Sequence, residues 1–145
     1  MPVTAKWYGL GLKAMANKEV DWDSDTIKVM LCTSAYAPNQ DTHAYKSDVT
    51  NEVTGTGYTA GGGTLANRTS SYTAGTNTLV LDADDLSWPN STITARYAVV
   101  YDSTPASDAT RPILGYVDFG QDVSTTAGTF SIVWDAAGIL TISAA

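Results

Sequence analysis

Residues 82–102 read DADDLSWPNSTITARYAVVYD, and this stretch decides the fold. In its second half, the side chains of an extended chain alternate between two faces. One face is apolar throughout and consists of Ile93, Ala95, Tyr97, Val99 and Tyr101. The other face begins polar and becomes apolar, with Thr92, Thr94, Arg96, Ala98 and Val100. The pattern predicts a central strand that is covered completely on one side and partly on the other.

Further strands are predicted on both sides of this stretch. Apolar alternation and turn signals place them at residues 26–33, 65–73, 77–82, 112–119, 129–134 and 139–143. A turn at 74–76 joins two of them as a hairpin, and residues 135–138 are expected to join the last two, with Gly138 in the left-handed conformation. We therefore expect a mainly β protein, an antiparallel β-sandwich or jelly-roll-like domain with one short N-terminal helix.

The N-terminal segment, residues 1–17, is predicted to contain that helix over residues 4–17, with Thr4 as its N-cap. Gly9 and Gly11 each cost about 1 kcal/mol relative to alanine inside a helix, so the segment needs a docking surface. That surface is either the sheet of the same domain or a neighbouring subunit. The expected contact stripe is Trp7, Leu10, Gly11, Ala14 and Met15.

Residues 34–63 form a long loop excursion with little apolar periodicity. A connection of this length in a compact domain usually carries function, is disordered or contains short elements of its own. It holds the only histidine, His43, between Tyr36 and Tyr45, and a glycine-rich part, GTGYTAGGG, at 55–63. The spacing of that part satisfies a loose dinucleotide-binding pattern, but three further glycines follow instead of a helix. It predicts a flexible turn or an exposed edge.

Length and charge limit the number of domains and the classes of partner that this chain can have. The 145 residues fit one domain, and the net charge of −7 opposes phosphate, so we expect no nucleic acid partner. We expect no membrane partner either, because no apolar run has membrane length and no secretory signal is recognisable at the N-terminus. Cys32 lies in an apolar run and is predicted to be a small buried hydrophobe.

No motif in the chain predicts catalysis, a metal or another cofactor. Asp21, Asp23 and Asp25 begin like a calcium loop, but Thr26 and Cys32 occupy the positions that need glycine and glutamate. One histidine and one cysteine do not suggest a nucleophile and its base. We expect a solvated acidic turn and no enzyme activity. Sequence-distant carboxylates and the many aromatic residues leave a glycosidase pair and a glycan-binding platform as alternatives.

Several short stretches resemble a group of small structural proteins of tailed bacteriophages. They are DTIKVMLCT (25–33), DTHAY (41–45), GY (57–58), ADD (83–85), ARYAVVY (95–101), GYVDF (115–119) and WDAAG (134–138). The resemblance extends over nearly the whole chain. It implies a decoration, or cement, protein that is made in the host cytoplasm and binds the outside of the major capsid protein, commonly as a trimer.

Two segments are the expected subunit or capsid contacts of such a protein, because they have the least self-sufficient local structure. The N-terminal segment would contribute Trp7, Leu10 and Met15, and the excursion would contribute Tyr36, His43 and Tyr45. A tail or fibre component, including one that binds a receptor or glycan, is the alternative within the virion. A hydrolase of cell-wall glycan is the alternative outside this class.

Overall fold

A computed structural model describes residues 2–144, and the predicted mainly β, antiparallel fold is confirmed. The helices are α1 (Gly9–Ala16) and the 3₁₀ helix η1 (Lys46–Asp48). The strands are β1 (Thr4–Trp7), β2 (Ile27–Cys32), β3 (Gly63–Thr64), β4 (Thr69–Thr73), β5 (Thr78–Asp82), β6 (Leu86–Ser91), β7 (Thr94–Asp102), β8 (Ile113–Ser124), β9 (Gly128–Ile132) and β10 (Leu140–Ser143).

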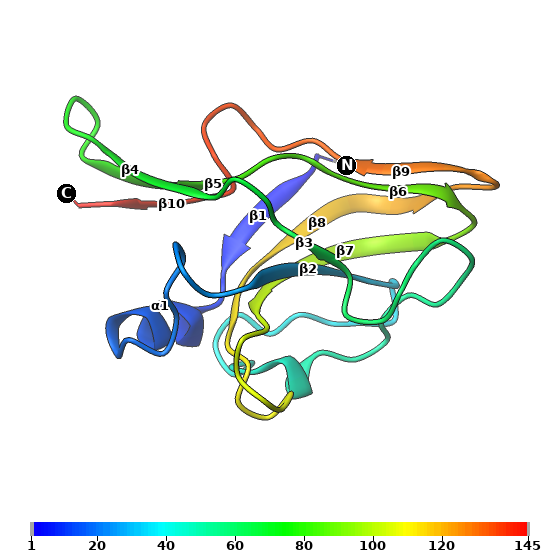
Figure 1. The fold of residues 1–145 in the computed structure, drawn as a ribbon, viewed down its shortest axis with the longest axis horizontal. Coiled ribbons are helices and arrows are strands. Elements are labelled where there is room, and N and C mark those ends of the chain that lie inside the picture. The colour runs from blue at the N-terminus through cyan, green and yellow to red at the C-terminus, as the bar shows by residue number, and fades with distance from the viewer. Residues whose placement is uncertain (1, 145) are drawn as a thin grey trace.

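The strands form two layers that pack as a β-sandwich (Figure 1). One layer is a five-stranded sheet in the order β1-β8-β7-β2-β3. The other consists of a three-stranded sheet, β10-β5-β4, and a two-stranded sheet, β6-β9. Apolar side chains from both layers make the main core, among them Val29, Leu31, Val100, Leu81 and Phe130. Burying a side chain of this size contributes roughly 1.5–3 kcal/mol.

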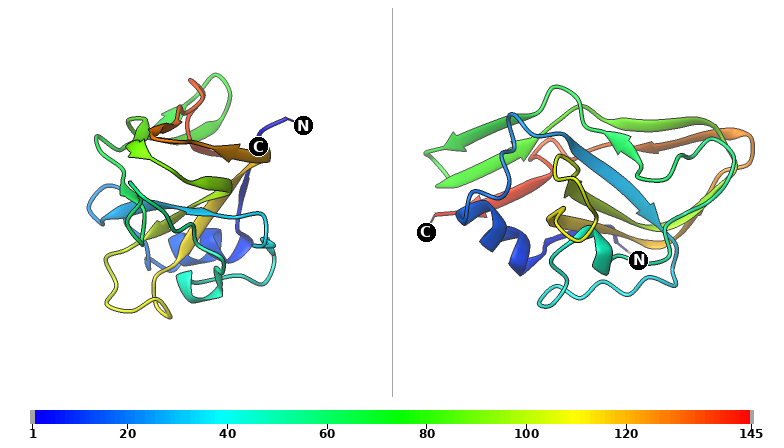
Figure 2. Two further views of the ribbon diagram at one scale, coloured as in Figure 1. Left: turned by 90° about the vertical axis from the view of Figure 1, so that its right-hand side faces the viewer. Right: turned by 60° about the horizontal axis from the view of Figure 1, so that its bottom comes forward.

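The five-stranded sheet is also covered on its other face. Residues 34–62 and the loop 103–112 lie together on this side (Figure 2). A second buried cluster lies beneath them and consists of Tyr8, Met30, Cys32, Tyr36, Val99, Tyr101 and Ile113. The prediction for Cys32 is confirmed, since its side chain is 0% exposed and burial raises the pKa of its thiol to about 12.

Strand β7 is central as predicted, but its two faces differ from the prediction. Ala95 faces the sandwich core, whereas Tyr97, Val99 and Tyr101 belong to the cluster on the opposite face. The register with β8 shifts between Ala95 and Tyr97, and this irregularity reverses the alternation of the side chains. A bulge between two strands leaves no mark in the hydrophobic pattern of one strand.

The predicted helix over residues 4–17 is wrong at residues 4–8. Residues Thr4–Trp7 form β1, which pairs with β8, and the N-cap of α1 is Tyr8 rather than Thr4. The edge of β8 offers backbone hydrogen bonds to residues 4–7. Extending a glycine-containing helix over these residues would stabilise the chain less than this pairing does. The helix that remains docks on the domain's own sheet, where Gly11 and Ala14 are buried.

Two connections also differ from their predictions. Residues 65–73 do not form one strand, because the chain leaves β3, turns at Asn67 (φ 51°) and enters the other layer as β4. The hairpin of β4 and β5 is confirmed, but the one expected at residues 135–138 is wrong. Strand β9 pairs with β6 and β10 with β5, although Gly138 does take a positive φ of 102°.

The acidic and glycine-rich segments are fixed by side chains. The backbone N–H groups of Asp23 and Ser24 donate to Asp21 Oδ1, so the acidic stretch forms a turn. The Gly61 N–H donates to both carboxylate oxygens of Glu52 at 3.0 and 2.9 Å. The end of the glycine-rich part pairs with β2 as the edge strand β3, which agrees with the expected exposed edge.

Replacing Gly11 with alanine should destabilise the fold by about 1–3 kcal/mol. The new Cβ would lie 2.5 Å from the carbonyl oxygen of Ile113 and 2.9 Å from that of Leu114, both backbone atoms. Gly9→Ala is the matched control, because its Cβ would meet only Gln40 O at 3.6 Å. It should stabilise the helix by up to about 1 kcal/mol. Urea unfolding measures both, and equal effects would contradict the predicted docking of α1.

Asp102 is a buried carboxyl group at the end of β7. It is 0% exposed, its Oδ1 accepts the N–H of Thr104 at 2.9 Å, and its Oδ2 has no hydrogen-bond partner among the described residues. Burial and the nearby Asp25 carboxylate raise the pKa of Asp102 to about 7. Between about pH 4 and pH 7, the folded protein therefore keeps a proton on Asp102 that the unfolded chain has released.

This proton makes the free energy of unfolding fall as pH rises from about 4 through about 7. Between pH 5 and pH 8, the free energy of unfolding of Asp102→Asn should fall less than that of the wild type. The difference should be at least about 1.4 kcal/mol, which corresponds to a shift of one pKa unit. Asp122→Asn, at an exposed position, is the control and should keep the wild-type slope. Urea unfolding at both pH values measures the slope, and an unchanged slope in Asp102→Asn would contradict the assignment.

Candidate functional site: an apolar groove between two strand edges

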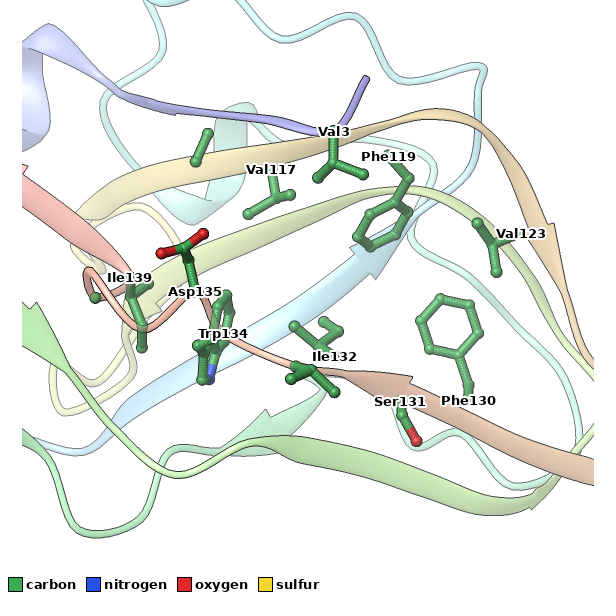
Figure 3. Close-up of a pocket in the computed structure, with 13 residues that line it drawn as sticks. Val3, Val117, Phe119, Val123, Phe130, Ser131, Ile132, Trp134, Asp135 and Ile139 are labelled. Atoms are coloured by element: carbon green, nitrogen blue, oxygen red, sulfur yellow. The ribbon is translucent and has the colours of Figure 1, made fainter. Parts of the chain in front are cut away.

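An apolar groove of about 560 Å³ lies between the two layers, beside β1 and β9 (Figure 3). One wall comes from β1, β8 and the residue before β1, and the other from β9 and the chain after it. The lining residues are Val3, Ala5, Val117, Phe119, Val123, Phe130, Ser131, Ile132, Val133, Trp134, Asp135, Gly138 and Ile139. Nearly all of these side chains are apolar.

The floor of the groove is buried, and its rim is exposed. Phe119 and Phe130 face each other across the layers with ring centroids 5.9 Å apart. At the rim, Val3 is 64% exposed, Val123 37% and Val133 75%. Five large hydrophobic residues are exposed in the described part of the chain, and three of them therefore surround this groove. Such a concentration of exposed apolar surface is typical of an interaction site.

Both strands beside the groove are edge strands. Among the described residues, β1 pairs only with β8, and β9 pairs only with β6. An edge strand presents backbone N–H and C=O groups that an added strand can pair with. A partner that adds a strand to a sheet edge binds as an extended segment. Its backbone forms hydrogen bonds with the edge, and its alternate side chains enter pockets. The groove has the layout for an extended, apolar segment.

The position of Trp134 is fixed by hydrogen bonds from its backbone and its indole. Its N–H donates to Asp85 Oδ1 at 2.9 Å, and Nε1 donates to the carbonyl oxygen of Asp84 at 3.0 Å. Trp134 therefore presents its apolar ring as part of the wall. Asp135 is the single ionisable residue among those that line the groove. This arrangement favours apolar binding and supplies no pair of groups for acid–base chemistry.

Two of the predicted contact residues are used within the fold. Nδ1 of His43 accepts the N–H of Asn39 at 3.3 Å, so the Tyr36 hydroxyl, 3.0 Å away, donates to the same nitrogen. The Tyr8 hydroxyl donates to Tyr36 at 2.8 Å. Tyr36 is 1% exposed, and burial raises its pKa to about 12. Tyr36 therefore has no surface for a partner, and with His43 it attaches the excursion to the sheet.

The other four predicted contact residues are partly buried. Trp7 donates from Nε1 to the carbonyl oxygen of Thr141 at 2.8 Å and packs against the main core, as does Met15. Leu10 and Tyr45, from the two predicted contact segments, line one shallow depression of about 250 Å³. The six residues therefore do not form one site, and none of them lines the groove.

The groove can be predicted only in part from the sequence. The alternation of Phe130, Ile132 and Trp134 correctly indicates that these side chains share a face, but a shared apolar face normally means core. Whether the opposite layer covers it depends on where that layer ends. The same alternation places Val133 on the opposite face from these three side chains, whereas the exposure of Val3 leaves no mark in the local pattern.

No protein-family model matches the chain, and no significant match was found among curated proteins or among solved structures. Within residues 2–144, no three His, Cys, Asp or Glu side chains are grouped so that they can hold a metal ion. The helices in this part of the chain are too short or too polar to cross a membrane.

An apolar fluorescent dye such as 1-anilinonaphthalene-8-sulfonate should bind the groove. The double variant Val3→Ser/Val133→Ser should lose most of the fluorescence increase, because both valines form the exposed rim. Thermal unfolding should change little, since exposed positions contribute within about 0.5 kcal/mol. The control is Tyr72→Ser, which removes an exposed ring on β4 outside the groove lining. Equal dye loss in both proteins would contradict a groove-specific site.

Proposed function

We propose that this chain is a structural protein of a tailed bacteriophage, a decoration (cement) protein that binds the outside of the major capsid lattice and stabilises it. In this proposal the groove receives an extended apolar segment of the major capsid protein. A ligand that binds only the assembled lattice stabilises that lattice by mass action. The role is structural and involves no catalytic step.

The resemblance of stretches such as 95–101 and 115–119 to phage structural proteins supports the proposal. These two stretches lie on β7, the central strand of the five-stranded sheet, and on its neighbour β8. The mainly β architecture is compatible with the lineage that the resemblance implies. The resemblance concerns the framework of the protein, so it supports a class of particle component.

The exposed apolar rim of the groove is the observation that carries the proposal. Valine side chains that are 64% and 75% exposed lie beside two unpaired strand edges. Covering one such side chain completely contributes roughly 1.5–3 kcal/mol. A partner strand at either edge would add backbone hydrogen bonds of about 0.5–1.5 kcal/mol each. Together these terms favour a protein partner that contributes an extended chain.

The net charge of −7 supports a place outside the capsid. Phosphate groups of packaged DNA repel an acidic protein, and positively charged side chains would be needed to overcome this repulsion. A trimer at local symmetry axes follows from the resemblance as part of the proposal. Leu10 and Tyr45, in their shared depression, stay the predicted residues for contacts between subunits.

Deleting residues 1–17 would not test the contact role of this segment, because it would remove β1 from the sheet. A sharper test uses the rim variant. Capsids of the encoding phage that lack the protein are mixed with wild-type protein or with Val3→Ser/Val133→Ser, and the bound fraction is measured by co-sedimentation. The wild-type protein should bind saturably. The rim variant should bind at least about tenfold more weakly, which corresponds to 1.4 kcal/mol.

Tyr72→Ser is the control and should bind like the wild type, since this residue lies outside the groove lining. Circular dichroism and thermal unfolding must show that both variants are folded. Cryo-electron microscopy of the virion gives the location. Density that bridges major-capsid subunits is expected, whereas density in the tail or baseplate would overturn the decoration role and favour the tail or fibre component.

A further inference from the structure

Another pocket, of about 340 Å³, lies on the other side of the five-stranded sheet, where the excursion meets the loop 103–112. Its lining includes Lys28, Lys46 and Arg111, three of the eight basic residues in a chain with a net charge of −7. Asp108 is the single acidic residue in the lining. The pocket therefore has a local excess of two positive charges.

Two of these cations, Lys28 and Lys46, lie beside Tyr101. Lys28 on β2 stands directly opposite Tyr101 on β7, so the two side chains are neighbours on the same face of the sheet. The Lys46 ammonium lies 5.7 Å from the centroid of the Tyr101 ring. The Tyr101 hydroxyl donates to the carbonyl oxygen of Gly61, which holds the ring in place. The lysines therefore converge from different segments on one side of the sheet.

Asp108 neutralises part of the positive charge of this pocket. Its carboxylate accepts Lys46 Nζ at 3.1 Å and Arg111 Nη1 at 2.9 Å, and these bonds hold the pKa of Asp108 below its usual value. Arg111 Nε donates to the carbonyl oxygen of Pro105 at 2.8 Å, which orients the guanidinium. Arg111 Nη2 and Lys28 Nζ have no hydrogen-bond partner within residues 2–144. The pocket therefore keeps donors for a further acceptor.

We propose that this pocket is a binding site for a small multivalent oxyanion, with carboxylate or phosphate oxygens placed between Lys28, Lys46 and Arg111. Guanidinium and ammonium groups are the preferred partners of such oxygens. Asp108 acts as an internal competitor, because its carboxylate uses two of the three cations. The site is independent of the groove and does not rest on the proposed function.

The test is an NMR titration of ¹⁵N-labelled full-length protein at fixed ionic strength. Citrate probes carboxylates, and inorganic phosphate probes phosphates. Saturable shifts are expected at the amides around the pocket, with the stronger probe identifying the ligand class. Lys28→Gln should weaken binding about tenfold because it removes one of the attracting charges. Asp108→Asn should strengthen binding about tenfold because it removes the competitor.

Lys13→Gln is the control, since it removes the same charge from α1, outside the pocket lining. It should leave the affinity unchanged. The opposite signs expected for Lys28→Gln and Asp108→Asn separate a binding site from a merely structural cluster, in which both substitutions would act in the same direction. Shifts that do not saturate with either probe, or equal effects of Lys13→Gln and Lys28→Gln, would overturn the proposal.

Discussion

The five-stranded sheet is buried on both faces, and the rest of the structure depends on this constraint. Side chains of β7 enter the sandwich core on one face, while Tyr97, Val99 and Tyr101 project from the other. The excursion must therefore fold back over the sheet to cover the second face. The hydrogen-bonded line from Tyr8 through Tyr36 to His43 holds it there. A loop without periodicity thus becomes an ordered part of the domain.

The two proposed sites arise where this covering is incomplete. The apolar groove opens at one side of the sandwich, because the layers are not joined between the edges of β1 and β9. The charged pocket forms where two loops meet above the ring of Tyr101. Because one site is apolar and extended and the other is compact and positively charged, they fit different ligands. A protein with both sites would combine an apolar protein contact with a separate anion site.

Hydrophobic alternation was sufficient to predict the fold class and most of the strands. Residues 26–33 and 77–82, for example, lie close to the observed β2 and β5. The same reasoning placed Cys32 in the core and the excursion outside regular structure. It failed at residues 4–7, where helical spacing was read in a segment that pairs with β8. The six contact residues were predicted in the segments with the least self-sufficient local structure, and the structure places none of them in the groove.

The sequence by itself determined that this chain makes antiparallel sheets around a long apolar strand, because side-chain period and turn residues are local properties. Only the tertiary structure decided which strands pair, where the register shifts and which apolar residues stay exposed. Val3 and Val117 are the same residue type and line the same groove, yet Val117 is buried and Val3 is 64% exposed. The difference depends on where the opposite layer ends, and that is set by contacts between residues far apart in the chain.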